Sequence, residues 1–249
     1  MSLETLVRPD LSARTDATAA APAAVRHDIY VNIHRALRLF MTDTLGRLGW
    51  LDTDDAEEVA ATLAQLGALL AMCRGHAESE NRFVHTAIEA RRPGASMRVA
   101  EEHEEQHATL AALEAEAATL AAAPTPALAQ RLYRHLALFV AENFEHMRLE
   151  ETALNQALWA AYDDAEILDV ERRIVEALPA DKMGLVLRWM TPALPPAERA
   201  AWLGGLQQAM PPEAFRGVLE TVRPTLDDKA WGKLVRALGL PARPWPAQG

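Results

Sequence analysis

The run VAATLAQLGALLAMCRGHAESENRFVHTAIEA, residues 59–90, combines a long helix-forming stretch with a pair of metal-ligand side chains. Alanine and leucine dominate it, and no proline interrupts it before Pro93-Gly94, so it predicts one long helix. Near its C-terminal end, His76 is followed four residues later by Glu80. Because a helix advances about 100° per residue, these two side chains project from one face as stacked neighbours. One helix can therefore offer two ligands to one ion.

Two other stretches place a histidine four residues before a second ligand-type side chain. They are His103-x-x-x-His107 and His146-x-x-x-Glu150. A single pair says little, because exposed helices often carry one, and the acidic run EEHEEQH around His103 also fits a solvated face. Three pairs on separate helices can instead converge on one buried point. The segments HAESENRFVHTAIEA (76–90) and HMRLEETALNQALWA (146–160) also share a pattern, as two half-sites related by a pseudo-twofold axis would.

A histidine in the preceding apolar run, IYVNIHRALRLF (29–40), adds a fourth contributor. The candidate ligands, five imidazoles and two carboxylates, are then His34, His76, Glu80, His103, His107, His146 and Glu150. Two octahedral ions have about twelve coordination places between them. The imidazoles fill about five, two bridging carboxylates about four, and an oxo or hydroxo bridge about two. About one place remains, which is what a small diatomic ligand needs.

Four long helical patterns precede a region of shorter ones, which predicts an all-α fold. We expect the first helix to begin near Pro22 and the third near Ser96. The second is expected to be capped by Asp52, Thr53 or Asp54. The fourth pattern covers 128–162. Long helices with short connectors favour an up-down-up-down four-helix bundle over residues 22–163, preceded by an N-terminal arm, residues 1–21.

Beyond residue 164, prolines divide the chain into shorter pieces. We expect short helices at 164–178, 180–191, 196–209, 212–222 and 226–238. Trp189, Trp202 and Trp231 lie at amphipathic positions and are expected to anchor this C-terminal extension, residues 164–249, on itself or against the bundle. The extension carries no cluster of ligand-type residues, so we expect it to be structural or to bind a protein partner.

Composition narrows the classes of function. Half of the 249 residues are apolar, which is ample for a core, and the formal net charge of −10 argues against nucleic acid or an anionic membrane as a partner. The single cysteine, Cys73, excludes an internal disulfide framework and fits a reducing compartment. We find no span of the apolar length needed to cross a bilayer and no compact signal-peptide core, so a cytoplasmic protein is expected.

The candidate ligands resemble those of the hemerythrin/HHE cation-binding proteins, which are four-helix bundles that hold a non-haem di-iron centre. The resemblance covers residues 22–163, with one histidine on the first helix, H-x-x-x-E on the second and H-x-x-x-H on the third. The fourth helix departs from the animal pattern. There the acid follows its histidine by five residues, which would select Glu151; bacterial members commonly use H-x-x-x-E, which selects Glu150. Helical geometry favours Glu150, with Glu151 as the alternative.

The resemblance implies two iron ions joined by an oxo or hydroxo bridge, although zinc or manganese fit the same side chains. It implies a protein that binds dioxygen, another diatomic molecule or peroxide for sensing, storage or iron and redox homeostasis. Alternatives are a di-iron enzyme that handles nitric oxide or peroxide or repairs iron centres, and an interaction module with a structural or sensory metal. A binding role is favoured over catalysis because the sequence offers no separate acid, base or substrate pocket. Ferritin-like sites need two Glu-x-x-His motifs, and only Glu104-x-x-His107 matches.

The remaining histidines and two other residues have simpler interpretations. His85 lies nine residues after His76, about half a turn round an α-helix, and is expected to point away. His135 lies about three turns from His146, and His27 near the start of the first helix. Tyr30 shares a face with His34 and could hydrogen-bond a bound species, or simply be an interior tyrosine. Cys73 is expected to be a buried, unreactive thiol.

Overall fold

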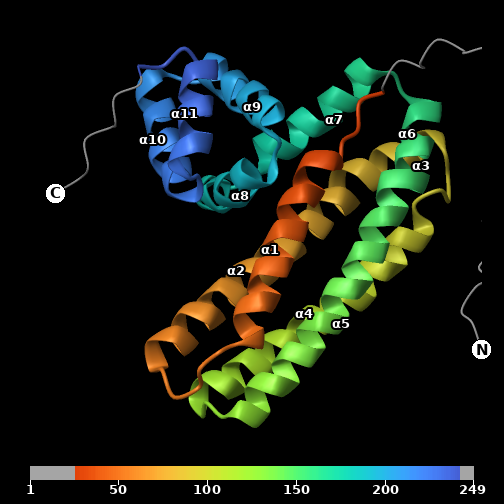
Figure 1. Ribbon diagram of the computed structural model, residues 1–249. Coiled ribbons are helices and arrows are strands. Elements are labelled where there is room, and N and C mark those ends of the chain that lie inside the picture. Colours follow the sequence, from red (N-terminus) through yellow and green to blue (C-terminus); the bar gives the residue numbers. More distant parts are fainter. Residues whose placement is uncertain (1–25, 242–249) are drawn as a thin grey trace, which may run out of the picture.

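The computed structural model describes residues 26–241, and within this range the regular structure is entirely helical (Figure 1). The expected arm, residues 1–21, and the first residues of the expected bundle lie outside the described range. The elements are α1 (Val31–Gly49), α2 (Ala56–Ser79), η1 (Glu80–His85), α3 (Thr86–Arg91), α4 (Met97–Ala122), α5 (Pro126–Leu149), η2 (Glu150–Leu154), α6 (Asn155–Ala161), α7 (Asp164–Ala177), α8 (Ala180–Ala193), α9 (Pro196–Ala209), α10 (Pro212–Val222), η3 (Arg223–Thr225) and α11 (Asp228–Ala237).

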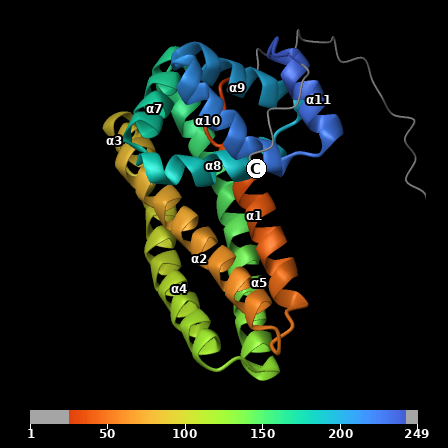
Figure 2. The same cartoon turned by 90° about the vertical axis from the view of Figure 1, so that its left-hand side faces the viewer.

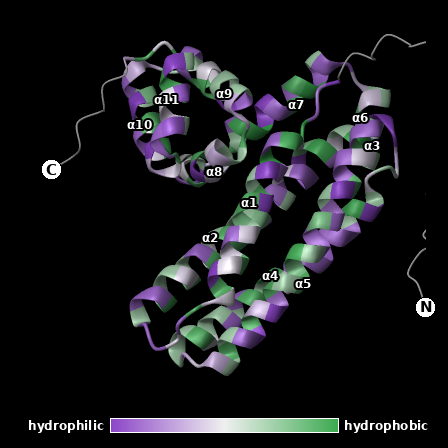
Figure 3. Ribbon diagram, in the orientation of Figure 1, coloured by the Kyte–Doolittle hydropathy of each residue, from purple (hydrophilic) through white to green (hydrophobic). Residues whose placement is uncertain are grey.

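The long helices α1, α2, α4 and α5 lie side by side. Helix α1 contacts α2 and α5, and α4 contacts the same two helices. Successive long helices run in opposite directions, with short connections at alternating ends (Figures 1 and 2). Two of them are extended by a π-helical segment and a further α-helical piece, so that α2, η1 and α3 form one continuous helix, as do α5, η2 and α6. Polar and apolar residues alternate around these helices (Figure 3), as expected for helices that bury one face.

Local side chains fix where the long helices begin. Asp55 caps α2 by accepting from the backbone N–H groups of Glu57 and Glu58. The expected caps Asp52, Thr53 and Asp54 were therefore wrong. Thr125 caps α5, and Pro126 occupies its first turn, where a missing N–H costs nothing. The connection between α3 and α4 turns at Gly94, whose φ of 84° is readily adopted only by glycine.

Helix α1 begins later than the expected start near Pro22, because residues 26–30 are held in a non-helical conformation. The guanidinium of Arg26 donates to Asp164 and to the backbone carbonyls of Trp159 and Tyr162. Asp28 then accepts from the backbone N–H groups of residues 30 and 31, as a capping residue does. The segment before α1 is therefore tied to the far end of the chain's fourth long helix.

Buried apolar side chains form three clusters. Cluster 1 fills most of the space between the long helices and comprises Ala36, Leu37, Phe40, Met41, Leu48, Leu66, Leu69, Leu70, Met72, Cys73, Leu110, Leu113, Leu120, Ala129, Leu132, Leu136, Phe139, Val140, Met147, Met190 and Leu194. Cluster 2 lies at the end near α3 and α6 and comprises Ile29, Tyr30, Val84, Ala87, Ile88, Val99, Leu154, Ala157, Leu158, Ile167 and Val170. Cluster 3, within the extension, comprises Leu187, Leu203, Phe215, Val218, Leu219, Val222, Leu226 and Leu234.

The extension forms short helices at nearly the ranges expected from its prolines, and α8 to α11 gather beside α1 (Figures 1 and 2). Trp189 of α8 stacks on Phe40 of α1, with ring centroids 3.9 Å apart, so the expected tryptophan anchor is present. Trp202 packs against both cluster 1 and cluster 3, and Trp231 packs within the extension itself. The buried guanidinium of Arg199 on α9 donates to the carbonyls at the C-terminal end of α8, which ties these two helices of the extension together.

The continuous helix Ala56–Arg91 is long and apolar enough, by length and composition, to cross a membrane. The expectation that no span reaches that length was therefore wrong for this helix. The finding is weak by itself, because the core helix of a soluble protein passes the same test. This helix packs on α1 and α4 and carries the buried carboxylate of Glu80, which a lone span in lipid would expose to hydrocarbon.

Candidate metal centre

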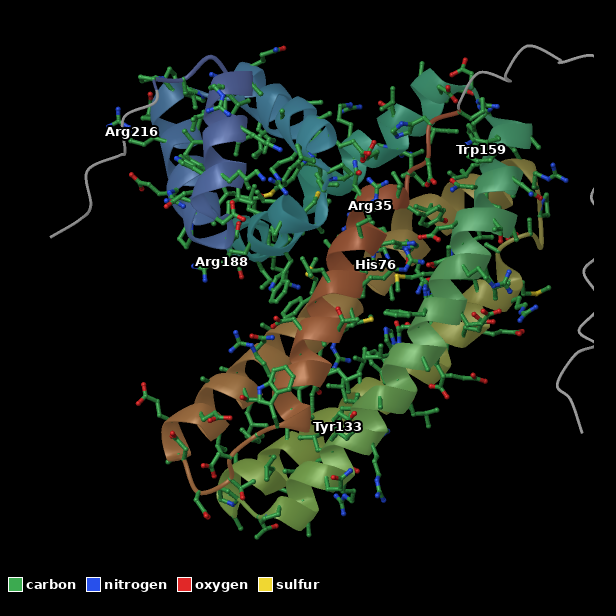
Figure 4. The ribbon with its side chains drawn as sticks, in the orientation of Figure 1. Arg35, His76, Tyr133, Trp159, Arg188 and Arg216 are labelled. Atoms are coloured by element: carbon green, nitrogen blue, oxygen red, sulfur yellow. The ribbon has the colours of Figure 1, made fainter. Side chains whose placement is uncertain are left out.

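A layer of polar side chains lies between clusters 1 and 2 and crosses all four long helices. On each helix the candidate ligands fall where the chain passes from one apolar cluster to the other. The side chains of the layer are His34 from α1, His76 from α2, Glu80 from η1, His103 from α4, His146 from α5 and Glu150 from η2. His76, labelled in Figure 4, lies among the long helices and is 15% exposed, whereas the other five are buried. Six of the seven candidates are thus brought together.

The six side chains form two overlapping groups, each of which could hold a metal ion. Group A is His34, His76, Glu80 and Glu150, and group B is Glu80, His103, His146 and Glu150. In each group one ligand atom per residue lies within 4.8 Å of every other. Both carboxylates belong to both groups, which is the arrangement that two neighbouring ions would need.

The two oxygens of each carboxylate face different groups. In group A, His76 Nε2 lies 3.2 Å from Glu80 Oε1, and His34 Nε2 lies 3.3 Å from Glu150 Oε2. In group B, His103 Nε2 lies 3.4 Å from Glu80 Oε2, and His146 Nε2 lies 3.1 Å from Glu150 Oε1. Each carboxylate therefore spans the two groups, with one oxygen in each.

The imidazole nitrogens approach one another as ligands of one ion do. The Nε2 atoms of His34 and His76 are 3.2 Å apart, and those of His103 and His146 are 3.0 Å apart. Two nitrogens about 2.1 Å from one ion are about 3.0 Å apart at a right angle and about 3.4 Å apart in a tetrahedron. The His103–His146 separation matches the right angle that six-coordinate ions use, and the His34–His76 separation lies midway between the two values.

Four buried oxygen atoms in the layer make no hydrogen bond. These are both carboxylate oxygens of Glu80 and both of Glu150. A buried polar atom without a partner typically costs roughly 1–3 kcal/mol, and more when it is charged. A cation between the two carboxylates would satisfy all four, so the side chains present fit a metal.

Outside the layer, hydrogen bonds fix three of the four imidazoles. Nδ1 of His34 lies 2.9 Å from Glu151 Oε1, and Nδ1 of His146 lies 2.8 Å from Glu102 Oε2. Nδ1 of His103 lies 2.9 Å from Asn81 Oδ1. An oxygen acceptor at Nδ1 places the ring proton there and leaves the Nε2 lone pair facing the layer. Each of the three rings can therefore donate through Nδ1 to its acceptor while Nε2 binds a cation.

These contacts separate the two adjacent glutamates, because Glu150 belongs to both groups and Glu151 to neither. Glu150 is fully buried and shared by both groups, as the four-residue spacing favoured. Glu151 instead bonds His34 from behind and is itself held by the Arg38 guanidinium, 2.5 and 3.0 Å away. Because Glu151 directly follows Glu150, the sequence already indicated that it lies at the site. The roles of Glu102 and Asn81 had no such signal, because each contacts a histidine on another helix.

A π-helical segment begins at each shared carboxylate, η1 at Glu80 and η2 at Glu150. A π-turn adds about one residue to an α-helix and rotates the following residues by about 100°. The two segments occur at equivalent places in the paired sequences 76–90 and 146–160, which supports the interpretation of two half-sites.

The same rotation explains why the prediction for His85 was wrong. Its ring is buried and stacks on His103, with centroids 5.3 Å apart and planes at 9°. Both of its ring nitrogens are buried without a hydrogen-bond partner. Nine residues of uninterrupted α-helix would have turned it away from His76, but the π-turn turns it back toward the layer.

His107 is the one candidate that the structure does not bring into either group. It is partly exposed, and its Nε2 is buried without a hydrogen-bond partner. His27 pairs with Glu171 at 2.8 Å, and His135 lies 3.5 Å from Glu116, so both lie outside the groups as expected.

The pKa values reflect a buried layer with two acids. Burial raises the pKa of Glu80 well above its ordinary value, and the neighbouring carboxylate adds to this. Burial acts the same way on Glu150, but contacts with three imidazoles hold its pKa well below the ordinary value. Burial, with the adjacent His34 as a further cause, lowers the pKa of His76 to about 3. Its imidazole is therefore neutral at physiological pH and able to bind a cation.

Two residues next to the layer also have shifted pKa values. Tyr30 packs on His34, with ring centroids 5.2 Å apart, and its buried Oη has no hydrogen-bond partner. Burial and the nearby carboxylates raise its pKa well above 10.0, so it stays a neutral O–H donor. Burial raises the pKa of Cys73 to about 12, which fits the unreactive thiol that we expected.

The chemistry available is that of a dry, imidazole-rich site for two cations that share two carboxylates. Comparison with known proteins adds no relative, since no protein-family model, no curated protein and no solved structure matches this chain.

Proposed function

We propose that this chain is a non-haem di-iron protein of the hemerythrin-like type that binds dioxygen or another small oxidant. In this proposal α1, α2, α4 and α5, with their continuations, are the up-down-up-down bundle of that family. The observation that carries the proposal is the pair of four-residue groups that share Glu80 and Glu150. The absence of an internal disulfide and the net negative charge support a soluble, cytoplasmic protein.

Iron is the metal that we propose for this ligand set. Imidazole suits iron, zinc and copper, whereas manganese favours oxygen ligands, and the layer has four imidazoles for two carboxylates. Zinc in closed sites is tetrahedral, with nitrogen atoms about 3.4 Å apart, whereas the observed pairs are 3.0 and 3.2 Å apart. Only the His103–His146 pair is nearer the octahedral value, so the preference for iron over zinc rests on the resemblance to the hemerythrin-like family.

Coordination counting supports a ligand-binding role. Of about twelve places on two octahedral ions, four imidazoles and two bridging carboxylates fill about eight. An oxo or hydroxo group shared by the two ions would fill about two more, and about two places would then be left for a small ligand.

The chain's own residues control what reaches the site. Clusters 1 and 2 exclude bulk water from both sides of the layer. The raised pKa of Tyr30 keeps its hydroxyl protonated, and because this hydroxyl has no partner it can donate a hydrogen bond to a bound species. The iron pair, when bound, supplies reversible electron exchange with an oxidant. Among the described residues, His85 and His107 are the other histidines with a buried ring nitrogen that lacks a hydrogen-bond partner.

The test is metal analysis with an optical spectrum after anaerobic loading with Fe(II) and exposure to air. We expect two irons per chain, and colour in the near-ultraviolet and visible that azide shifts. A colourless protein with less than one iron per chain would refute the proposal. Turnover of nitric oxide or peroxide by the loaded protein, measured without oxygen, would replace a binding role with the enzymatic alternative.

A further inference from the structure

A cavity of about 230 Å³, partly open to solvent at exposed side chains such as Lys182, lies where the C-terminal extension meets the long helices. Its walls come from α1, α2, η1 and α7 to α9, so the extension and the long helices build it together. Most of the wall is apolar, with side chains such as Ile33, Met72, Val186, Met190, Trp202 and Leu206. The cavity reaches His76 and Glu80 of group A at one end. The space is therefore both an apolar compartment and a route toward the metal layer.

The wall also carries polar groups without partners. The buried Oη of Tyr30 and the buried Oδ1 of Asn32 make no hydrogen bond. Tyr30 is 1% exposed, so water does not satisfy its hydroxyl from outside. Such groups are costly unless a bound molecule completes them. The Tyr30 hydroxyl can donate to an acceptor on a bound molecule, whereas Asn32 Oδ1 needs a donor, so of the two only Tyr30 supports a ligand with an anionic end.

A cation borders the same cavity. Lys182, on the first turn of α8, lines the wall, and its Nζ lies beside Gly75, one residue before His76. Within the described residues, no ion pair or hydrogen bond joins Lys182 to a protein acid. Of the acids in the wall, Glu171 is paired with His27, and Glu80 belongs to the metal layer. The ammonium group is therefore available to an anionic ligand.

We propose that this cavity binds a small monocarboxylate with an apolar body. Its carboxylate pairs with Lys182, and its body lies among the apolar side chains of α1, α2 and α8. At about 30 Å³ for each water-sized group, the cavity accepts roughly eight such groups, the size of a medium-chain fatty acid or an aromatic acid. This inference stands on the cavity and its cation, so it holds or fails independently of the iron.

Octanoate is a suitable probe, with 1-octanol and octylammonium as uncharged and cationic matches. Isothermal titration calorimetry on the full chain, with and without iron, should show one saturable octanoate site. We expect octanol to bind at least about tenfold more weakly, since a charge-assisted hydrogen bond is lost. Octylammonium should bind more weakly still. No saturable octanoate binding, or equal affinity for the three probes, overturns the proposal.

Two variants locate the site. Lys182→Met should weaken octanoate about tenfold or more and leave octanol unchanged, whereas Lys229→Met, on the remote helix α11, should change neither. Gly75→Leu places a side chain where the only neighbour near its Cβ is Lys182 Nζ at 3.8 Å, so it should fill the cavity without a backbone clash. It also replaces a glycine within a helix, which favours folding. Full octanoate affinity in a folded Gly75→Leu protein would place the binding elsewhere.

Discussion

The neighbouring residues Glu150 and Glu151 allow the site to be tested with two nearly identical substitutions. Glu150→Gln removes one negative charge and replaces one of two shared oxygens with an amide N–H₂, which cannot bind a cation. Because those oxygens face different groups, the change weakens both sites and leaves a buried donor among imidazoles. Metal binding to groups A and B should therefore fall together, with at most one weakly held iron per chain.

Glu151→Gln leaves all six members of the two groups in place. It removes the charge behind His34 Nδ1 and one partner of Arg38 but retains an oxygen acceptor. Losing an outer-layer partner typically costs about 10–100-fold in metal affinity, or about 1.4–2.7 kcal/mol. Competition with a chelator of known affinity should show two irons per chain at saturation, bound that much more weakly.

Circular dichroism at each titration point controls for unfolding of either variant. Glu145→Gln, which alters an exposed glutamate paired with Arg148, is a matched control and should keep wild-type affinity. If Glu151→Gln loses both irons while Glu150→Gln keeps them, the five-residue alternative is correct and the assignment of the bridging carboxylate is wrong.

Three further predictions concern single side chains. His107→Ala should keep two irons per chain, since His107 lies outside both groups, whereas His76→Ala should lose the iron of group A; iron analysis of the two variants decides it. Trp189→Ala removes the stack on Phe40 and should lower the free energy of unfolding by about 2 kcal/mol, which is less than the usual cost at a fully buried aromatic site. It should also speed proteolysis between α7 and α8. An unchanged denaturant midpoint would show that Trp189 does not anchor the extension. Burial raises the pKa of Cys73 from 9.0 to about 12, so the thiol ionises in the unfolded chain before it does in the folded protein. The free energy of unfolding should therefore fall by up to about 1.4 kcal/mol per pH unit between about pH 9 and pH 12. Urea titrations at pH 8 to 11 should show that Cys73→Ala removes this contribution to the pH dependence.

Much of the fold follows from local chemistry. Prolines and capping side chains mark helix ends, and the short helices of the extension lie close to the ranges that its prolines predict. The start of α1 was misjudged because contacts of Arg26 with residues more than a hundred positions away hold residues 26–30 out of the helix. A contact between distant parts of the chain leaves no periodic signal in sequence.

The site was predictable to the extent that it depends on α-helical spacing. The pairs that begin at His76 and His146 end at the carboxylates where the π-helical segments start, so the spacing within them is still that of an α-helix. Beyond those points the π-helical turn rotates the following side chains relative to a regular α-helix, so the predicted orientation of His85 was wrong. The contacts of Glu102 with His146 and of Asn81 with His103 could not be predicted either. Which side chains meet across two helices depends on how each helix is rotated about its own axis.

X-ray absorption of the iron-loaded protein tests the central claim most directly. Two ions that share Glu80 and Glu150 should show a second iron at about 3.5 Å, with about two imidazoles on each metal. That result, with two irons per chain by metal analysis, would support the shared site. An iron spectrum with nitrogen and oxygen neighbours but no second metal within about 4 Å would contradict it, because the two groups would then not be occupied together.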